Sequence, residues 1–202
     1  MPQLTINAET GSSGGQARGI DNSWATVRGQ TNADDADQNS ARMASNFSGG
    51  SYFIRRGFLK YDLTGIPSGS TIDAVTYQPY CLSSGSSNDD STSLEVVVST
   101  ADDNIGTNDY NNITFSSLGS INLSSINQDD YSDITLNSTG IDHVKDNLTN
   151  GSVKFAHITG RDLSNSAPGG DNECQINDGD AAQPTRIVVT YTSPGGILFM
   201  LT

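Results

Sequence analysis

Apolar and polar residues alternate in several short runs along the chain, and this spacing of two is typical of half-buried β-strands. The first run places Leu4, Ile6 and Ala8 on one face with polar residues between them. A longer run over 51–61 contains Gly57, which predicts a β-bulge or a close backbone contact at that position. The remaining predicted strands cover 72–81, 94–98, 134–136, 153–155 and 187–191. The pattern therefore predicts a mainly β fold.

A single helix is predicted among these strands. Ile141, Val144 and Leu148 recur at helical spacing, Ser138 or Thr139 can cap the start, and Asn150-Gly151 ends the pattern. Stretches rich in Gly, Ser, Asn and Asp separate the strands, and the longest runs over 164–183 as a predicted loop. Together these features predict an all-β protein, an antiparallel jelly-roll β-sandwich with one short helix.

The chain shows no internal repeat and one change of composition, at its C-terminus. Residues 1–193 are expected to form one jelly-roll domain, and residues 194–202 an apolar tail that follows the break at Pro194-Gly195-Gly196. Five consecutive residues of this tail are apolar: Ile197, Leu198, Phe199, Met200 and Leu201. Such a run is expected to be buried, either as a last strand in the domain's own core or by docking on a partner subunit.

The charge balance narrows the range of partners. The 202 residues include 23 acidic and 10 basic side chains, which gives a formal net charge of −13. A surface this acidic repels phosphate backbones and anionic lipid headgroups, so we expect neither nucleic-acid nor membrane binding. The chain also lacks the run of about 18 apolar residues that a membrane-spanning helix requires.

Two cysteines are present, Cys81 at the end of a predicted strand and Cys174 in the predicted loop. They are too few for a disulfide framework or a cysteine-rich zinc site. The sequence leaves open whether they are two thiols or a single disulfide.

Candidate chemistry in the sequence is sparse. No Gly-x-Ser-x-Gly elbow occurs, and of the two histidines His157 falls in a predicted strand, where a structural role is expected. We therefore expect no enzymatic activity. An oxygen-rich cluster in the predicted 164–183 loop is a candidate calcium site, and a plain solvated acidic loop is the favoured alternative. Its candidate ligands are Asp171, Glu173, Asp178 and Asp180.

Aromatic side chains in polar surroundings are candidates for stacking on sugars. Tyr110 and Tyr131 meet this description, because each is flanked by Asp, Asn or Ser residues. They are the predicted glycan-binding residues.

The run over 59–75, Leu-Lys-Tyr-Asp-Leu-Thr-Gly-Ile-Pro-Ser-Gly-Ser-Thr-Ile-Asp-Ala-Val, together with the closing Pro-Thr-Arg-Ile-Val-Val-Thr-Tyr over 184–191, resembles the DNRLRE family of jelly-roll domains, which look like carbohydrate-binding modules. A looser group of this kind, common among virion proteins of tailed phages, is similar also at 23–28, 56–59 and 109–112. The resemblance covers about residues 4–192, and its motifs are structural.

This resemblance implies a non-enzymatic virion structural protein, such as a capsid decoration protein or a fibre or tail component. Its expected partners are other copies of itself, with a trimer as the first guess, and capsid or tail proteins. Because Met1–Ile6 has no secretory signal, the expected location is the virion surface after synthesis in the host cytoplasm. The alternative is a carbohydrate-binding module of a surface or secreted protein, which would bind cell-surface glycans outside the cell.

Overall fold

The computed structural model describes residues 1–11, 14–38, 41–87 and 92–195. Strands make up 46% of the chain and helices 16%, and the antiparallel sheets form a curled half-barrel with a few short helices. The predicted all-β antiparallel class is therefore confirmed. The apolar tail residues 197–201 lie outside the described residues.

The smaller sheet has four strands and contains both the first and the last described strand. Its order is β1 (Gln3–Asn7), β14 (Arg186–Thr192), β6 (Thr71–Gln78) and β11 (Ile134–Thr135). Since β1 pairs only with β14, it forms an edge of this sheet within the described part of the chain.

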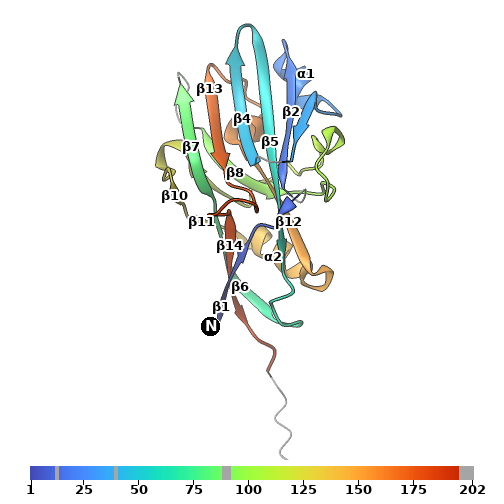
Figure 1. Cartoon of the computed structure of the whole chain (residues 1–202), viewed down its shortest axis with the longest axis vertical. Helices are drawn as coiled ribbons and strands as arrows, with labels where there is room; N and C mark the ends of the chain where they lie inside the picture. Colours follow the sequence, from blue (N-terminus) through green and yellow to red (C-terminus); the bar gives the residue numbers. More distant parts are fainter. Residues whose placement is uncertain (12–13, 39–40, 88–91, 196–202) are drawn as a thin grey trace, which may run out of the picture.

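The larger sheet has ten strands and is organised around one long strand, β5 (Ser51–Asp62). The main path of the sheet runs β10 (Asp130–Tyr131), β7 (Tyr80–Ser87), β13 (Asp171–Ile176), β4 (Ala41–Ser48), β5, β12 (Ser152–Thr159), β8 (Ser93–Val98) and β9 (Gly119–Asn122). In addition, β2 (Gly15–Asp21) pairs with β5 and carries β3 (Asp35–Asp37). The hairpin of β4 and β5 projects at the pole of the molecule opposite β1 and the end of β14 (Figure 1).

The main apolar core lies where the two sheets face each other. At its centre Tyr61 of β5, Tyr77 of β6 and Phe155 of β12 meet edge to face, with ring centroids 5.9 to 6.2 Å apart. All three side chains are fully buried, and Tyr77 belongs to the other sheet. This aromatic group therefore joins the two layers.

A second apolar cluster covers the other face of the ten-stranded sheet. Along β5, Ile54, Arg56 and Phe58 point toward it, while Leu59 and Tyr61 point toward the main core. The short helix α1 (Trp24–Gly29) packs there through Trp24 and Val27. Because both faces of β5 are covered, its middle is almost continuously buried, as is usual for a central strand.

The predicted bulge or close contact at Gly57 is a close contact. Gly57 pairs with His157 of β12, and a Cβ atom at Gly57 would lie 1.9 Å from His157 Nε2. The fully buried imidazole thus occupies the space that any side chain at position 57 would need. The structural role predicted for His157 agrees with this position.

The predicted helix is present as α2 (Ser138–Asp146), with Val144 buried in the main core. Its N-cap is Asn137, whose side chain accepts from Gly140 N at 3.1 Å, and it ends two residues before Leu148. That leucine begins a separate 3₁₀ turn, η4 (Leu148–Asn150).

Two further helices, α1 and α3 (Gly160–Ser164), were not predicted. Each has six residues or fewer, too short for a repeating apolar face. Two other 3₁₀ turns among the described residues are η2 (Thr107–Asp109) and η3 (Leu123–Ser125). No helix among the described residues is long and apolar enough to cross a membrane.

Two sequence-based boundaries are corrected by the structure. The run predicted as one strand over 72–81 is two strands, and Pro79 is the residue at which the chain passes from β6 in one sheet to β7 in the other. The predicted 164–183 loop contains β13, which was missed because a buried position in its alternation is Asn172. Asn172 fits there because its Nδ2 donates to Ser45 O at 3.3 Å.

Candidate functional site

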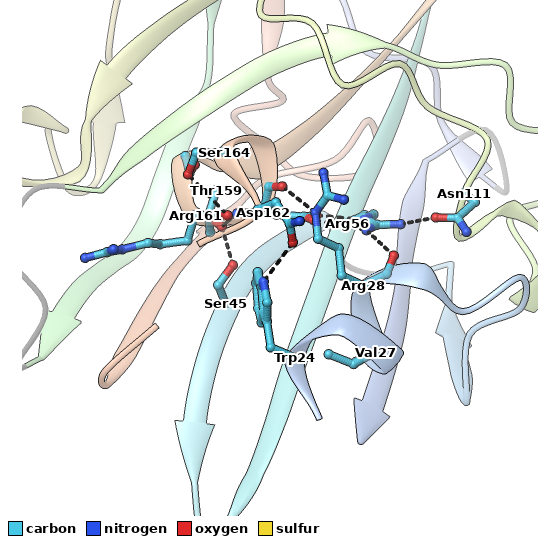
Figure 2. Close-up of polar contacts among 12 residues, drawn as sticks. Trp24, Val27, Arg28, Ser45, Arg56, Asn111, Thr159, Arg161, Asp162 and Ser164 are labelled. Atoms are coloured by element: carbon cyan, nitrogen blue, oxygen red, sulfur yellow. Dashed lines mark hydrogen bonds and ion pairs between the residues drawn. The ribbon is translucent and has the colours of Figure 1, made fainter. Parts of the chain in front are cut away.

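A fully buried arginine is the most unusual feature of the second cluster. Arg56 is 0% exposed, and all five of its N–H groups have acceptors. Nε and Nη2 donate to the two carboxylate oxygens of Asp162 at 2.7 and 3.0 Å. Nη1 donates to Tyr110 O at 2.9 Å and Asn111 Oδ1 at 2.5 Å, and Nη2 also donates to Arg28 O at 3.2 Å. This set of contacts is called the Arg56 clamp below (Figure 2).

The carboxylate of the clamp is held by the local structure of α3. The Thr159 hydroxyl caps this helix by accepting from Asp162 N at 3.1 Å, which fixes the residue at the first turn. A second arginine, Arg28 of α1, donates from Nε to Asp162 O at 2.8 Å and lies 3.4 Å from Asp162 Oδ1. Asp162 therefore links α3 both to β5 and to α1.

The electrostatics favour the charged form of the arginine. Burial by itself lowers the pKa of Arg56, but the charge of Asp162 and its hydrogen bonds outweigh this effect, so that the pKa is raised. The guanidinium also lies 4.1 Å from the centroid of the Tyr110 ring, a cation–π contact. The Arg56 guanidinium is thus charged and has an acceptor for each of its N–H groups, an arrangement suited to holding elements together.

Tyr110 belongs to this clamp and is not a surface residue. It is 0% exposed, its hydroxyl donates to Val27 O at 2.9 Å, and burial raises its pKa. The polar residues beside it serve the fold: the buried Asp109 accepts from Gly106 N at 2.9 Å and from Asp102 N at 2.9 Å. The prediction of a glycan contact at Tyr110 is wrong, because its polar neighbours are satisfied internally.

Tyr131 is half-buried, and one face of its ring is occupied. The Arg186 guanidinium lies 3.7 Å from the ring centroid, and the hydroxyl donates to Pro184 O at 3.1 Å. Tyr80 meets it edge to face at 5.1 Å. The glycan contact at Tyr131 stays a prediction.

The four candidate calcium ligands separate into two pairs. Asp171 and Glu173 lie on the outer face of β13, where Glu173 pairs with Arg55 at 3.6 Å. Asp178 and Asp180 lie beyond the end of that strand, and Asp180 accepts from Gly11 N at 3.1 Å. Among the described residues no group of three or more His, Cys, Asp or Glu side chains is placed to hold a metal ion. The predicted four-ligand cluster is corrected, because an extended strand separates residues that a loop could have gathered.

An open pocket of about 410 Å³ lies beside α3, and Asp162 of the clamp is not among its lining residues. It is lined by Thr92, Ser93, Glu95, Gly160, Arg161, Leu163 and Ser164. Glu95 is 7% exposed, and its carboxylate accepts from the Ser93 and Ser117 hydroxyls, each at 2.5 Å. The buried hydroxyl of Thr92 has no hydrogen-bond partner among the described residues.

The pocket therefore combines hydroxyl, carboxylate and guanidinium groups with one apolar side chain. A small polar ligand such as a sugar could use this set of donors and acceptors.

Sequence reasoning identified neither the clamp nor the pocket. One signal for the clamp was available: two adjacent arginines, Arg55 and Arg56, interrupt a run that is otherwise apolar or aromatic. Alternation along the strand places Arg56 on the same face as Ile54 and Phe58. A buried charge with a partner was therefore predictable. Its partner, Asp162, is 106 residues away and carried no such signal.

The fold and these contacts define an all-β antiparallel sandwich protein with a buried ion-pair clamp on its second face. No protein-family model matches the chain, and no curated protein matches its sequence.

Proposed function

We propose that this chain is a non-enzymatic structural subunit of a virion, either a capsid decoration protein or a fibre or tail component. The observation that carries the proposal is that the molecule has two distinct ends. The first and last described strands are neighbours at one pole, where Tyr191 N donates to Pro2 O at 3.1 Å, and the β4–β5 hairpin projects at the other (Figure 1). A subunit anchored through the end that holds β1 and β14 would expose the β4–β5 hairpin on the particle surface. The resemblance to phage virion jelly rolls supports the same role.

Two features of the chain suit attachment. The open edge of β1 could accept a strand from a neighbouring subunit, since edge strands are ready templates for pairing. The apolar residues 197–201 follow β14 in sequence, and docking on a partner is the role proposed for them. Other copies of the chain in a trimer, and capsid or tail proteins, are the proposed partners.

The register of β1 shows which backbone groups face outward. Ala8 N donates to Thr185 O, and Tyr191 N donates to Pro2 O, so even-numbered residues of β1 bond to β14. In an antiparallel pair the intervening residues direct their N–H groups away from the partner strand. Thr5 therefore has its N–H on the open edge.

We expect Thr5→Pro and a deletion of residues 195–202 each to lower binding to particles at least tenfold while the domain stays folded. Proline removes the outward N–H without touching the bonds to β14, and the deletion removes the proposed docking segment. Thr5→Val, which keeps the N–H, is the matched control and should bind normally. Particles lacking the protein would be mixed with each variant, and bound protein measured after sedimentation.

Mass spectrometry of purified particles from the source organism tests the proposal more directly. The chain should be present in stoichiometric amounts relative to capsid or tail proteins. Its absence from such particles would overturn the proposal. Full binding by both variants would place the attachment surface elsewhere, and unfolding of the deletion variant would assign the tail to the core.

The pocket beside α3 favours a second candidate, a carbohydrate-binding module. Its polar lining groups match sugar hydroxyls, and Leu163 offers an apolar contact. We expect Glu95→Gln and Arg161→Ala each to weaken glycan binding at least tenfold on an array, because each removes a charged hydrogen-bonding group. Tyr131→Ala, which lies outside the pocket lining, should leave that binding unchanged. If only Tyr131→Ala abolishes binding, the sugar site is at Tyr131; if no glycan binds, this candidate fails.

A further inference from the structure

The two cysteines, 93 residues apart in sequence, meet inside the protein. Cys81 belongs to β7 and Cys174 to β13, which are neighbours in the ten-stranded sheet. Both side chains are fully buried, and their Sγ atoms lie 2.9 Å apart. Two sulfur atoms at this distance are closer than an ordinary non-bonded contact and need only a small movement to reach bonding distance.

A break in the strand register places both cysteines on one face of the sheet. Gln175 pairs with Ser83, whereas the next residue, Ile176, pairs with Cys81, so that Leu82 is the extra residue of a β-bulge. Without this bulge Cys81 would point to the opposite face, because a shift of one residue reverses every side chain. Leu82 instead points outward and is 41% exposed. The bulge thus exposes a leucine and brings two thiols together.

We propose that Cys81 and Cys174 form an intramolecular disulfide when the chain folds in the presence of a small-molecule disulfide such as oxidised glutathione. In the first step the Cys81 thiolate attacks the oxidant, forming a mixed disulfide and releasing one glutathione thiolate. In the second step the Cys174 thiolate attacks the Cys81 sulfur and displaces the second glutathione. The two protein thiols are oxidised by two electrons, glutathione disulfide is reduced to two thiols, and the two protons pass to the released thiolates.

The buried position of the pair restricts when this reaction can occur. The hydrogen bond to Cys81, together with burial, raises the pKa of the Cys174 thiol, so the folded protein holds almost no reactive thiolate there. Oxidant also has no access to a fully buried sulfur. The bond therefore forms during folding, before the two sulfur atoms are buried. Afterwards the same burial protects the bond from reductant. This inference concerns the stability of the fold and the oxidation state of the two cysteines, and it does not depend on the proposed function.

The test compares two ways of refolding the same protein. Denatured, reduced chain is refolded with a mixture of oxidised and reduced glutathione, or with excess dithiothreitol. The oxidised product should be a monomer lighter by two hydrogen atoms, with one peptide joining Cys81 to Cys174. Its Tm should be about 10 °C above that of the reduced product, because the bond closes a long loop.

Cys81→Ser and Cys174→Ser are the matched controls, and each should abolish both the mass change and the Tm difference. If a serine variant fails to fold, the mass and peptide map of the two wild-type products still decide the question. A product that keeps two titratable thiols, carries glutathione adducts or forms linked dimers would overturn the proposal.

Discussion

Replacing Arg56 with methionine is expected to lower the free energy of unfolding by about 3–5 kcal/mol, the usual cost of removing one partner of a buried ion pair. The substitution leaves the Asp162 carboxylate inside the second cluster, with Arg28 as its remaining cationic partner. It also leaves the Tyr110 carbonyl and the Asn111 side chain without the donor they share. The clamp ties β5, α1 and α3 to one guanidinium. Removal of this guanidinium should therefore weaken the packing of the whole second apolar cluster.

The neighbouring residue supplies a matched control for this prediction. Arg55→Met removes an arginine from the same strand, but its partner Glu173 is 3.6 Å away with a side chain 41% exposed. A pair this exposed contributes about 1 kcal/mol or less. Guanidinium denaturation of both variants should therefore give clearly different midpoints. Equal losses for Arg55→Met and Arg56→Met would show that the clamp does not stabilise the fold.

A loss of stability between about pH 6.5 and pH 3 is the second expected result, and His157 is its source. Burial lowers the pKa of His157 to about 3 in the folded protein, whereas the unfolded chain has an ordinary value of about 6.5. Above pH 6.5 both states hold a neutral imidazole, so His157 has no effect on the pH dependence. Below that, only the unfolded state takes up the proton, and the folded state loses stability until the pH reaches about 3. The total effect is of the order of 4–5 kcal/mol.

His157→Gln isolates this contribution, because glutamine keeps polar atoms at the site but does not titrate. The carboxyls of Asp62 and Asp103 have lowered pKa values and also lose stability on acidification, but they do so in both proteins. The difference between the two profiles of unfolding free energy against pH is the quantity to measure. Parallel profiles from pH 7 to pH 4 would show that His157 takes up its proton equally in the folded and unfolded states, so that burial does not lower its pKa.

Much of the fold follows from the sequence because its strands carry a local signal. The alternation of Leu4 with Ile6, and of Ile187 with Val189, predicts strands that the structure confirms as β1 and β14. The spacing of Ile141 and Val144 predicts α2, and Gly57 predicts the close approach that the His157 ring makes. In each case one segment of chain contains the whole pattern.

The partners of the residues in the candidate site could not be predicted, because its contacts join segments that are distant in sequence. Asp162 meets Arg56 across 106 residues, and the bulge at Leu82 turns Cys81 toward Cys174 across 93 residues. Tyr110 has polar neighbours in sequence but is buried in space, while Asp171 and Asp178 are close in sequence but belong to different elements. The sequence by itself determined the all-β class, α2 and the strands with clear alternation, such as β1 and β14, because periodicity and turn residues act over a few positions. It did not predict β2, β4 or β13. Only the tertiary structure decided which charges are paired, which aromatic rings are exposed and which thiols meet, because these depend on strand register and on the packing of both faces of β5.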